Sequence, residues 1–246
     1  MNTSQRNRGR LSLAAIASTL MMLTTGAAMV SAAGPAVSPS GKSLVVPRDQ
    51  ARLGTVYHAL PGRDRQVFFE SDAPLEKTKG QSNAVIGYVV AGPDNAPAKL
   101  QAGQWRLPVT SMDTGIELRN HHMASKEWLN ADEFPDITFT LSGVESVKPG
   151  KSGSGFNSYT GTLVGSMTIH GVTNDIRIPN ASITFLDASD RTRSIASGDL
   201  LAIRASYSVT LTEFGVNNGI IGGKVANEIA VETVLFMSTT PPERQR

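Results

Sequence analysis

The fold of this chain is decided by the stretch Leu201-Ala202-Ile203-Arg204-Ala205-Ser206-Tyr207-Ser208-Val209-Thr210-Leu211. Every odd position is apolar or aromatic, and nearly every even position is small, polar or charged. A period of two is typical of a β-strand with one buried face and one solvated face. The stretch therefore predicts a strand that lies between an apolar core and water.

The same alternation recurs along the chain. Segments 66–71 and 84–90 are further strand candidates, whereas 225–237 alternates less regularly. Polar loops are predicted at 148–155 and 187–199. About eight strands with turns between them predict an all-β barrel or sandwich. The other inward positions are Trp105, Leu107, Val109, Ile137, Phe139, Leu141, Leu163, Gly165, Met167 and Ile169.

Whether such a barrel is hollow is left open by the residue pattern. A closed barrel of about eight strands is either just filled by side chains or able to hold one small ligand. The inward positions mix small and large residues, as in Ala205 beside Tyr207 and Gly165 beside Met167. That mixture leaves room for a guest, and it is also what an ordinary tapered core requires.

Four motifs follow one another in a fixed order. They are Ser111-Met112-Asp113-Thr114-Gly115, Arg119-Asn120-His121-His122-Met123, Phe134-Pro135-Asp136-Ile137-Thr138-Phe139 and Met167-Thr168-Ile169-His170-Gly171-Val172-Thr173. From Val109 to Thr173 the chain resembles the YceI family on these motifs, with a weaker similarity at 213–216 and 225–232. Several motifs in order are far more specific than any one of them.

The resemblance implies an elongated, eight-stranded antiparallel, lipocalin-like barrel over residues 51–238, with a short helical insert around residues 116–132. It also implies an apolar tunnel that holds a polyisoprenoid or similar long-chain amphiphile, such as an isoprenoid, quinone or fatty amide. The chain departs from the family at Asn120, where Asp is usual, and at Thr212-Glu213, where Arg and Asp are usual. Residues 56–100 match the family's first strands only loosely, with Gly80 placed in a turn, and the strand assignment of 51–100 is left open.

The helical insert has its own local signals. Residues 115–132 lack a period of two, and 124–131 is predicted to form a helical turn or two. Ser125 is a suitable N-cap before Lys126 and Glu127. Pro135 would end that turn and begin the next strand.

The first residues predict export. Arg6, Arg8 and Arg10 precede an uncharged apolar stretch that ends in Val30-Ser31-Ala32. This pattern predicts a cleaved signal peptide over 1–32 and a periplasmic or secreted protein; the alternative is an uncleaved membrane anchor. Residues 33–50 are predicted to be a flexible lead-in and 239–246 a disordered tail.

Composition narrows the possible partners. The chain has 23 basic and 21 acidic residues. The predicted signal peptide removes three Arg and no acid, which leaves 20 against 21. With no basic cluster carrying interleaved aromatics, nucleic-acid binding is not expected. There is no cysteine, so neither a disulfide nor a thioether lipid anchor can form.

No catalytic or metal site is predicted. His121 and His122 are adjacent, and neither they nor His58 and His170 show His-x-His or His-x-x-x-His spacing. Ser111 lacks the context of a nucleophile elbow. The set Asp113, Arg119 and Asp132 is interpreted as structural, with Asp113 capping a turn and Arg119 pairing with a carboxylate. Glu228 and Glu232 are interpreted as a solvated strand face.

The first functional hypothesis is an exported carrier, not an enzyme and without a cofactor, that sequesters a long-chain amphiphile. Alternatives are an interaction module with a filled barrel, and an enzyme that uses His121 or His122 with Asp113. Transient contact with a membrane surface and a homodimer remain open. The predicted tunnel-lining residues are Trp105, Leu107, Val109, Ile137, Phe139, Met167, Ile169, Ile203, Tyr207 and Val209.

Overall fold

The structure is a computed structural model that describes residues 42–60, 65–92 and 100–244. The predicted signal peptide, residues 33–41 of the predicted lead-in and the last two residues of the predicted tail lie outside this range. Among the described residues, no helix has the length and apolar character required to cross a lipid bilayer.

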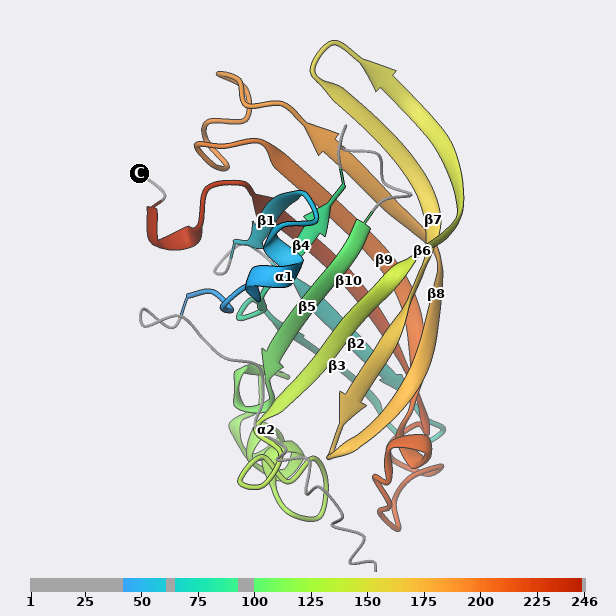
Figure 1. Cartoon of the computed structure of the whole chain (residues 1–246). Helices are drawn as coiled ribbons and strands as arrows, with labels where there is room; N and C mark the ends of the chain where they lie inside the picture. The colour runs from blue at the N-terminus through green and yellow to red at the C-terminus, as the bar shows by residue number, and fades with distance from the viewer. Residues whose placement is uncertain (1–41, 61–64, 93–99, 245–246) are drawn as a thin grey trace, which may run out of the picture. The chain divides into compact units, whose positions relative to one another are not determined.

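Strands dominate the described chain (Figure 1). The strands are β1 (Thr55–Ala59), β2 (Val67–Asp72), β3 (Lys77–Ser82), β4 (Ile86–Ala91), β5 (Leu100–Pro108), β6 (Asp136–Gly153), β7 (Phe156–Ile169), β8 (Val172–Leu186), β9 (Leu200–Thr210) and β10 (Glu228–Ser238). The helices are α1 (Arg48–Ala51) and α2 (Glu117–Ala124), with short 3-10 turns η3 (Val109–Ser111), η4 (Leu211–Phe214) and η5 (Pro242–Arg244).

Eight of these strands close into a ring. They are hydrogen-bonded in the order β1-β4-β5-β6-β7-β8-β9-β10, and β10 pairs back onto β1. Each of these pairings is antiparallel. The predicted eight-stranded antiparallel barrel is confirmed, and the sandwich is excluded.

Strand β10, which closes the ring, pairs with both β1 and β2 along one of its sides. Near its C-terminal end β10 pairs with β1 through Met237 and Ser238. Nearer its start it pairs with β2 through residues 230–233, and β2 pairs in turn with β3. An isolated bridge between Gln81 and Asp113 and a hydrogen bond between the hydroxyls of Ser82 and Ser111 link β3 to the segment after β5. Along this side the wall therefore consists of β1 and β4 in one half of the barrel, the upper half, and of β2 and β3 in the lower half.

Two β-bulges lie where the halves meet. The β6–β7 register shifts between Glu145 and Lys148, and the β7–β8 register shifts between Gly161 and Leu163. Ser146 and Asn180, in the strands that carry the extra residue, have positive φ of 50° and 55°. A bulge bends its strand and increases the local twist. The bend of β6, β7 and β8 is visible in Figure 1.

The upper half of the interior is packed solid. Its inward side chains are almost fully buried and belong to one apolar cluster, in which Tyr57 and Phe185 meet edge to face with ring centroids 5.8 Å apart. The members from this half are Tyr57, Ala59, Val89, Ala91, Leu100, Ala181, Ile183, Phe185, Leu201 and Met237.

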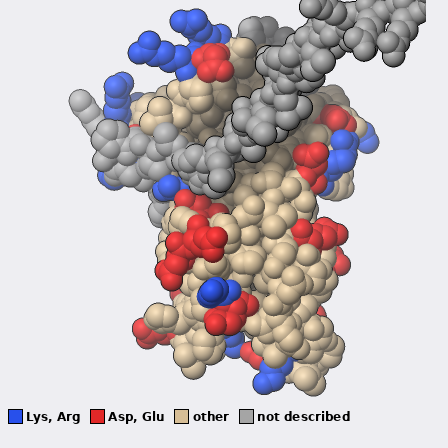
Figure 2. All heavy atoms as spheres, turned by 60° about the horizontal axis from the view of Figure 1, so that its bottom comes forward, with Lys and Arg blue, Asp and Glu red and all other residues tan. Residues whose placement is uncertain are grey.

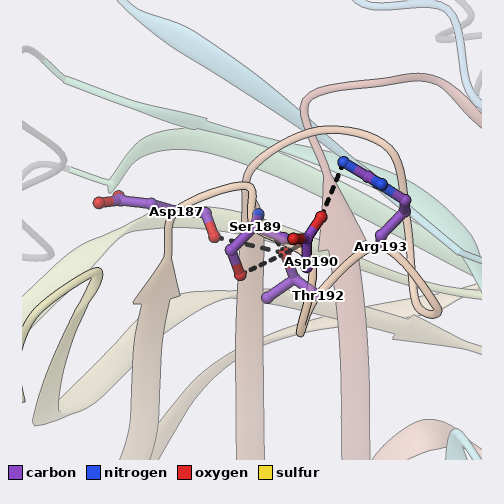
Figure 3. A network of polar contacts seen from close by, with 5 residues as sticks. All are labelled: Asp187, Ser189, Asp190, Thr192 and Arg193. Carbon is purple, nitrogen blue, oxygen red and sulfur yellow. Dashed lines mark hydrogen bonds and ion pairs between the residues drawn. The ribbon is translucent and has the colours of Figure 1, made fainter.

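The loop from β8 to β9 packs at the upper end. The buried Thr192 organises it: its Oγ1 accepts from the Ser189 amide at 2.8 Å and donates to the Asp187 and Ser189 carbonyls (Figure 3). Arg193 pairs with Asp190 at 2.9 Å in the same loop. Ala196 is buried against Leu200 on the outer face of β9, so the predicted 187–199 loop is confirmed and packs on the outside of the barrel.

The segment before β1 covers the outside of the upper half. Leu44 is 2 % exposed and packs on Ile86, Tyr88 and Val90 of β4. The Tyr88 hydroxyl donates to Gln50 of α1 at 2.8 Å. This cover explains why β4 is buried on both faces and shows no alternation. The described part of the predicted lead-in is thus folded, while the predicted domain limits stay a prediction.

Three local predictions were wrong. Residues 148–155 are not a loop, because β6 and β7 continue as a bulged hairpin to Gly153 and Phe156. Gly80 is not in a turn, because it lies within β3 opposite Phe69. The alternation at 105–109 ends early: Pro108 ends β5, and Val109 begins the turn η3.

The helical insert is confirmed, but its position within the segment differs. Helix α2 covers 117–124 and ends at Ser125, which is its C-cap, and the predicted turns begin at the same residue. Residues 125–134 follow as consecutive turns held by backbone bonds such as Asn130 N–H to Ser125 O at 2.8 Å. The local cap signal at Ser125 therefore marked the end of one turn system and the start of the next.

Candidate functional site: an apolar cavity in the lower half of the barrel

The lower half of the barrel is hollow. A cavity of about 520 Å³ lies between the inward faces of β2, β5–β10, helix α2 and the 216–225 loop. Ile116, Leu118 and Ile220 line it and are 49, 66 and 44 % exposed, so the cavity reaches the molecular surface at this end. Its size is within the range of small-molecule sites, about 300–1,000 Å³.

Nine of the ten predicted tunnel residues line the cavity: Trp105, Leu107, Ile137, Phe139, Met167, Ile169, Ile203, Tyr207 and Val209. The tenth, Val109, is buried in the core at 2 % exposure but does not line the cavity, because η3 turns it away from the strand. Their role in binding stays a prediction.

Sequence reasoning missed the lining from β2 and β10. Phe69 comes from β2, and Ile229, Val231 and Leu235 come from β10. The alternate positions of β10 carried a usable signal, since Ile229, Val231, Thr233 and Leu235 form one face. It was obscured because Ala230, Val234 and Phe236 make the outer face apolar as well.

Aromatic rings form one side of the cavity. Trp105 of β5 and Phe139 of β6 are cross-strand partners, and their rings stack with centroids 5.8 Å apart and planes at 24°. On β9 the side chain of Tyr207 lines the cavity as well, and burial raises the pKa of its hydroxyl. A phenol in this position stays neutral, so these rings present no charge to a guest.

Four ionisable side chains that line the cavity lie near its opening: Glu76, Arg119, His122 and Lys224. Arg119 of α2 pairs with Glu76, with Nη2 and Oε1 2.7 Å apart, which confirms that Arg119 pairs with a carboxylate. Lys224 is exposed, and His122 lies on the same helix as Arg119. Seen with this end turned forward, charged side chains of both signs stand in separate small groups (Figure 2). No single sign of charge marks the opening.

Asp113 has a structural role. Its Oδ1 accepts from the Gly115 amide at 2.8 Å and from Asn120 Nδ2 at 2.7 Å. These two hydrogen bonds, the Asn120 bond first, lower the pKa of Asp113. Asn120 Oδ1 in turn accepts from the Thr114 amide at 2.8 Å. The amide at position 120 therefore both donates and accepts, and it joins α2 to the segment that leads into it.

The remaining candidate groups do not converge. His170 occupies a tight β7–β8 turn with φ of 51°, followed by Gly171 at 75°, and its ring meets Phe134 edge to face. His58 lies in β1, in the upper half. Within residues 42–60, 65–92 and 100–244, no three His, Asp or Glu side chains are grouped to hold a metal ion. Glu228 and Glu232 are exposed, as predicted.

An eight-stranded antiparallel barrel with an apolar cavity open at one end defines a lipocalin-like barrel. The sequence matches the YceI-like domain over residues 61–236. This is more than half of the chain, and the chain belongs to this family. The resemblance recognised in the four motifs is confirmed.

Relatives agree with this assignment. A UPF0312 protein of Staphylococcus aureus (strain MSSA476) is 27 % identical over 154 residues, which are 61 % of this chain and 80 % of that protein. BcnA of Burkholderia cenocepacia is similar in structure, with a TM-score of 0.50 at 20 % identity over 73 % of this chain and 95 % of BcnA. A Campylobacter jejuni YceI protein gives 0.51 at 18 %, over 67 and 86 %. At these identities the two structures show the fold alone.

Proposed function

We propose that this protein is a carrier that sequesters a polyisoprenoid or a similar long-chain amphiphile in the lower half of its barrel. The observation that carries the proposal is the apolar cavity of about 520 Å³ that reaches the surface beside α2. Each buried methylene of a guest contributes about 0.8 kcal/mol, so about ten carbons suffice for tight binding without a polar anchor.

The distribution of polarity supports one orientation of the guest. Trp105, Met167 and Ile203 line the cavity away from its opening, whereas Arg119, Glu76 and Lys224 lie near it. Burying an ionised headgroup among apolar side chains costs several kcal/mol. The guest therefore enters with its hydrocarbon end first and leaves its polar end beside α2.

The surface around the opening supports uptake from a lipid surface. Leu75, Ile116, Leu118 and Ile220 are large apolar side chains that are 44–75 % exposed. The Leu75 amide donates to the Gly223 carbonyl at 3.1 Å, which places Leu75 against the loop that carries Ile220. Clustered exposed apolar residues mark interaction sites. In this proposal they contact the membrane transiently while the guest is transferred, in a periplasmic or secreted setting provided by the predicted leader.

The two rival hypotheses have less support. An interaction module with a filled barrel requires a solid interior, and the lower half is hollow. An enzyme based on His121 or His122 with Asp113 requires these groups to meet, but Asp113 is occupied by Gly115 and Asn120. We therefore propose a binding protein without catalytic activity.

The test is titration of the purified mature protein with retinol, an isoprenoid alcohol whose fluorescence rises in an apolar site, together with native mass spectrometry of the untreated protein. A saturable one-to-one complex is expected. Leu75→Ser, at an exposed leucine that does not line the cavity, should slow transfer of retinol from phosphatidylcholine vesicles while leaving the final affinity within about twofold. Leu53→Ser, at an exposed leucine in the turn between α1 and β1, is the matched control. A protein that neither carries nor takes up any amphiphile would overturn the proposal.

A further inference from the structure

Aromatic rings on the cavity wall lie directly on glycines. Phe69 of β2 faces Gly80 of β3 in the strand register. A Cβ atom on Gly80 would clash with the end of the Phe69 ring, at 2.7 Å from both Cε1 and Cε2. The ring therefore occupies the space that any other residue at position 80 would need for its own side chain.

Trp105 shows the same arrangement with two glycines. Gly87 of β4 is its cross-strand partner, and a Cβ atom there would lie 2.5 Å from Cδ1 of the indole. Gly103, two residues earlier on β5, would place a Cβ atom 2.9 Å from Cη2 of the same indole. The indole is thus laid down along the wall across both glycines.

Phe139 of β6 completes the series. A Cβ atom on Gly165 of β7 would lie 2.9 Å from Cζ of its ring. Phe69, Trp105 and Phe139 all line the cavity, and the four glycines are buried. Three rings on three different strands therefore lie against the wall, each on a position without a side chain.

The arrangement has a consequence for the space inside. A large ring on a barrel wall projects toward the axis unless a neighbouring position is empty enough to receive it. Glycine is the residue that leaves such a position empty, and it is otherwise unfavourable within a strand. Glycines inside strands commonly mark a close approach of another group.

We infer that Gly80, Gly87, Gly103 and Gly165 determine the size and shape of the cavity, and hence which guests fit. They do so by drawing Phe69, Trp105 and Phe139 away from the barrel axis. This inference rests on the proposed function. It identifies the specificity-determining residues as glycines that need not touch the guest, because they act through the rings that do.

Two of the glycines allow a clean test. Around Gly80 the three nearest atoms to an added Cβ all belong to the Phe69 ring. Around Gly103 the two nearest belong to Trp105, and the Tyr88 carbonyl follows at 3.2 Å. Gly87 is unsuitable, since its Cβ would lie 2.5 Å from the Gln104 carbonyl, and Gly165 is unsuitable because the Thr140 carbonyl is closer still. Gly143 of β6 has no atom within 4 Å of an added Cβ and is the matched control.

The experiment measures retinol affinity for the wild-type protein and for Gly80→Ala, Gly103→Ala and Gly143→Ala. We expect Gly80→Ala and Gly103→Ala to bind at least about tenfold more weakly, and Gly143→Ala to bind as the wild type does. Adding Phe69→Leu to Gly80→Ala should restore most of the affinity, because the smaller side chain returns the lost space. Thermal unfolding of each variant separates a reduced cavity from a damaged fold.

A second measurement does not depend on any guest. Crystal structures of Gly80→Ala and Gly103→Ala should show the ring of Phe69 or Trp105 displaced toward the barrel axis and a smaller cavity. Wild-type protein that binds no retinol while the rings move as expected would overturn the proposed function alone. Variants that bind like the wild type, or whose rings and cavity stay unchanged, would overturn the inference about the glycines.

Discussion

The two halves of this barrel share the long strands β6 to β10 and have opposite interiors. In the upper half the rings of Tyr57 and Phe185 meet edge to face, and Tyr57, Ile183 and Phe185 are almost fully buried. In the lower half Phe139 and Tyr207 also face inward, and a cavity of about 520 Å³ remains between the walls. The difference shows that an apolar inward face does not by itself produce a filled core.

The two halves differ in the size of the residues that lie next to the large inward-facing side chains. Ile183 on β8 is completely buried between its large cross-strand partners, Tyr159 of β7 and Ile203 of β9. In the lower half, glycines such as Gly80 and Gly165 receive rings from adjacent strands and so keep these rings off the axis. The bulges at Ser146 and Asn180 lie at the boundary. Stability is therefore expected to depend mainly on the upper half, and binding on the lower half.

The largest expected difference between the halves comes from replacing one inward-facing residue in each half by aspartate. Ile183→Asp should unfold the barrel, because an unpaired buried charge costs at least about 3 kcal/mol. Tyr207→Asp should remain folded, since water from the open end can hydrate the carboxylate, but should lose retinol binding by more than about tenfold. Circular dichroism on heating and the retinol titration measure the two outcomes.

Ser206→Asp is the control for the faces of β9, because Ser206 is exposed and adjacent to Tyr207. It should alter stability by less than about 0.5 kcal/mol. If Ile183→Asp and Tyr207→Asp unfold at the same denaturant concentration, the two halves do not differ in the way described.

Replacing one isoleucine by alanine in each half compares how closely the two interiors are packed. Ile183→Ala should cost about 4 kcal/mol, because a closely packed site cannot collapse around the missing atoms. Ile229→Ala, on the cavity wall, should cost about 1 kcal/mol, since Ile229 already lacks partners on one side. Urea unfolding followed by tryptophan fluorescence gives both values, and equal losses would contradict the comparison.

Adding a large side chain should lower stability in the filled half and weaken retinol binding in the hollow half. Ala181→Phe in the filled half should destabilise the barrel by about 3 kcal/mol through overpacking. Ala205 lines the cavity. Ala205→Phe should therefore change the free energy of unfolding by less than about 1 kcal/mol while weakening retinol binding. Affinity that survives Ala205→Phe unchanged would place the guest elsewhere.

The smallest expected effect is a pH dependence of stability that comes from His58, where β1 pairs with β10 and closes the barrel. His58 of β1 lies opposite Ser238 of β10, and burial lowers its pKa from 6.5, with Glu243 acting in the opposite direction. The unfolded chain therefore binds a proton at pH values where the folded barrel does not, and stability falls as the pH decreases through 6.5. His58→Gln should reduce this loss between about pH 7 and about pH 5, measured by thermal unfolding. The exposed His121→Gln is the control, and identical pH profiles for both variants would exclude His58 as the source.

Much of the fold was accessible from sequence for a clear reason. The odd positions of 201–209 face inward as predicted, because a strand at a core boundary must place alternate residues on opposite faces. The segments that escaped prediction depend on neighbours. Strand β3 contains no large apolar residue, and it is a strand because it pairs with β2 along its whole length. Strand β4 shows no alternation because Leu44 covers its outer face.

The candidate site divides in the same way. The inward direction of Trp105, Phe139 and Met167 follows from alternation, and nine of ten such residues line the cavity. Their contribution to a cavity was not predictable, because Ile183 and Ile203 carry the same local pattern and only the latter borders the empty space. Helix α2 and the 216–225 loop also line the cavity. Their positions depend on the path of the chain between strands, which hydrophobic periodicity does not predict.

By itself the sequence determined the strands with one apolar face, and its ordered motifs placed the chain in the YceI family, because alternation and motif order are read along the chain. The alternation left barrel and sandwich open, and the closed barrel with an apolar interior was an expectation from the family resemblance. Only the tertiary structure decided that one half of that interior is filled and the other is hollow. The physical reason is that volume is a property of facing side chains. Whether a ring stands toward the axis or lies on the wall depends on a glycine in an adjacent strand or two residues away in its own strand.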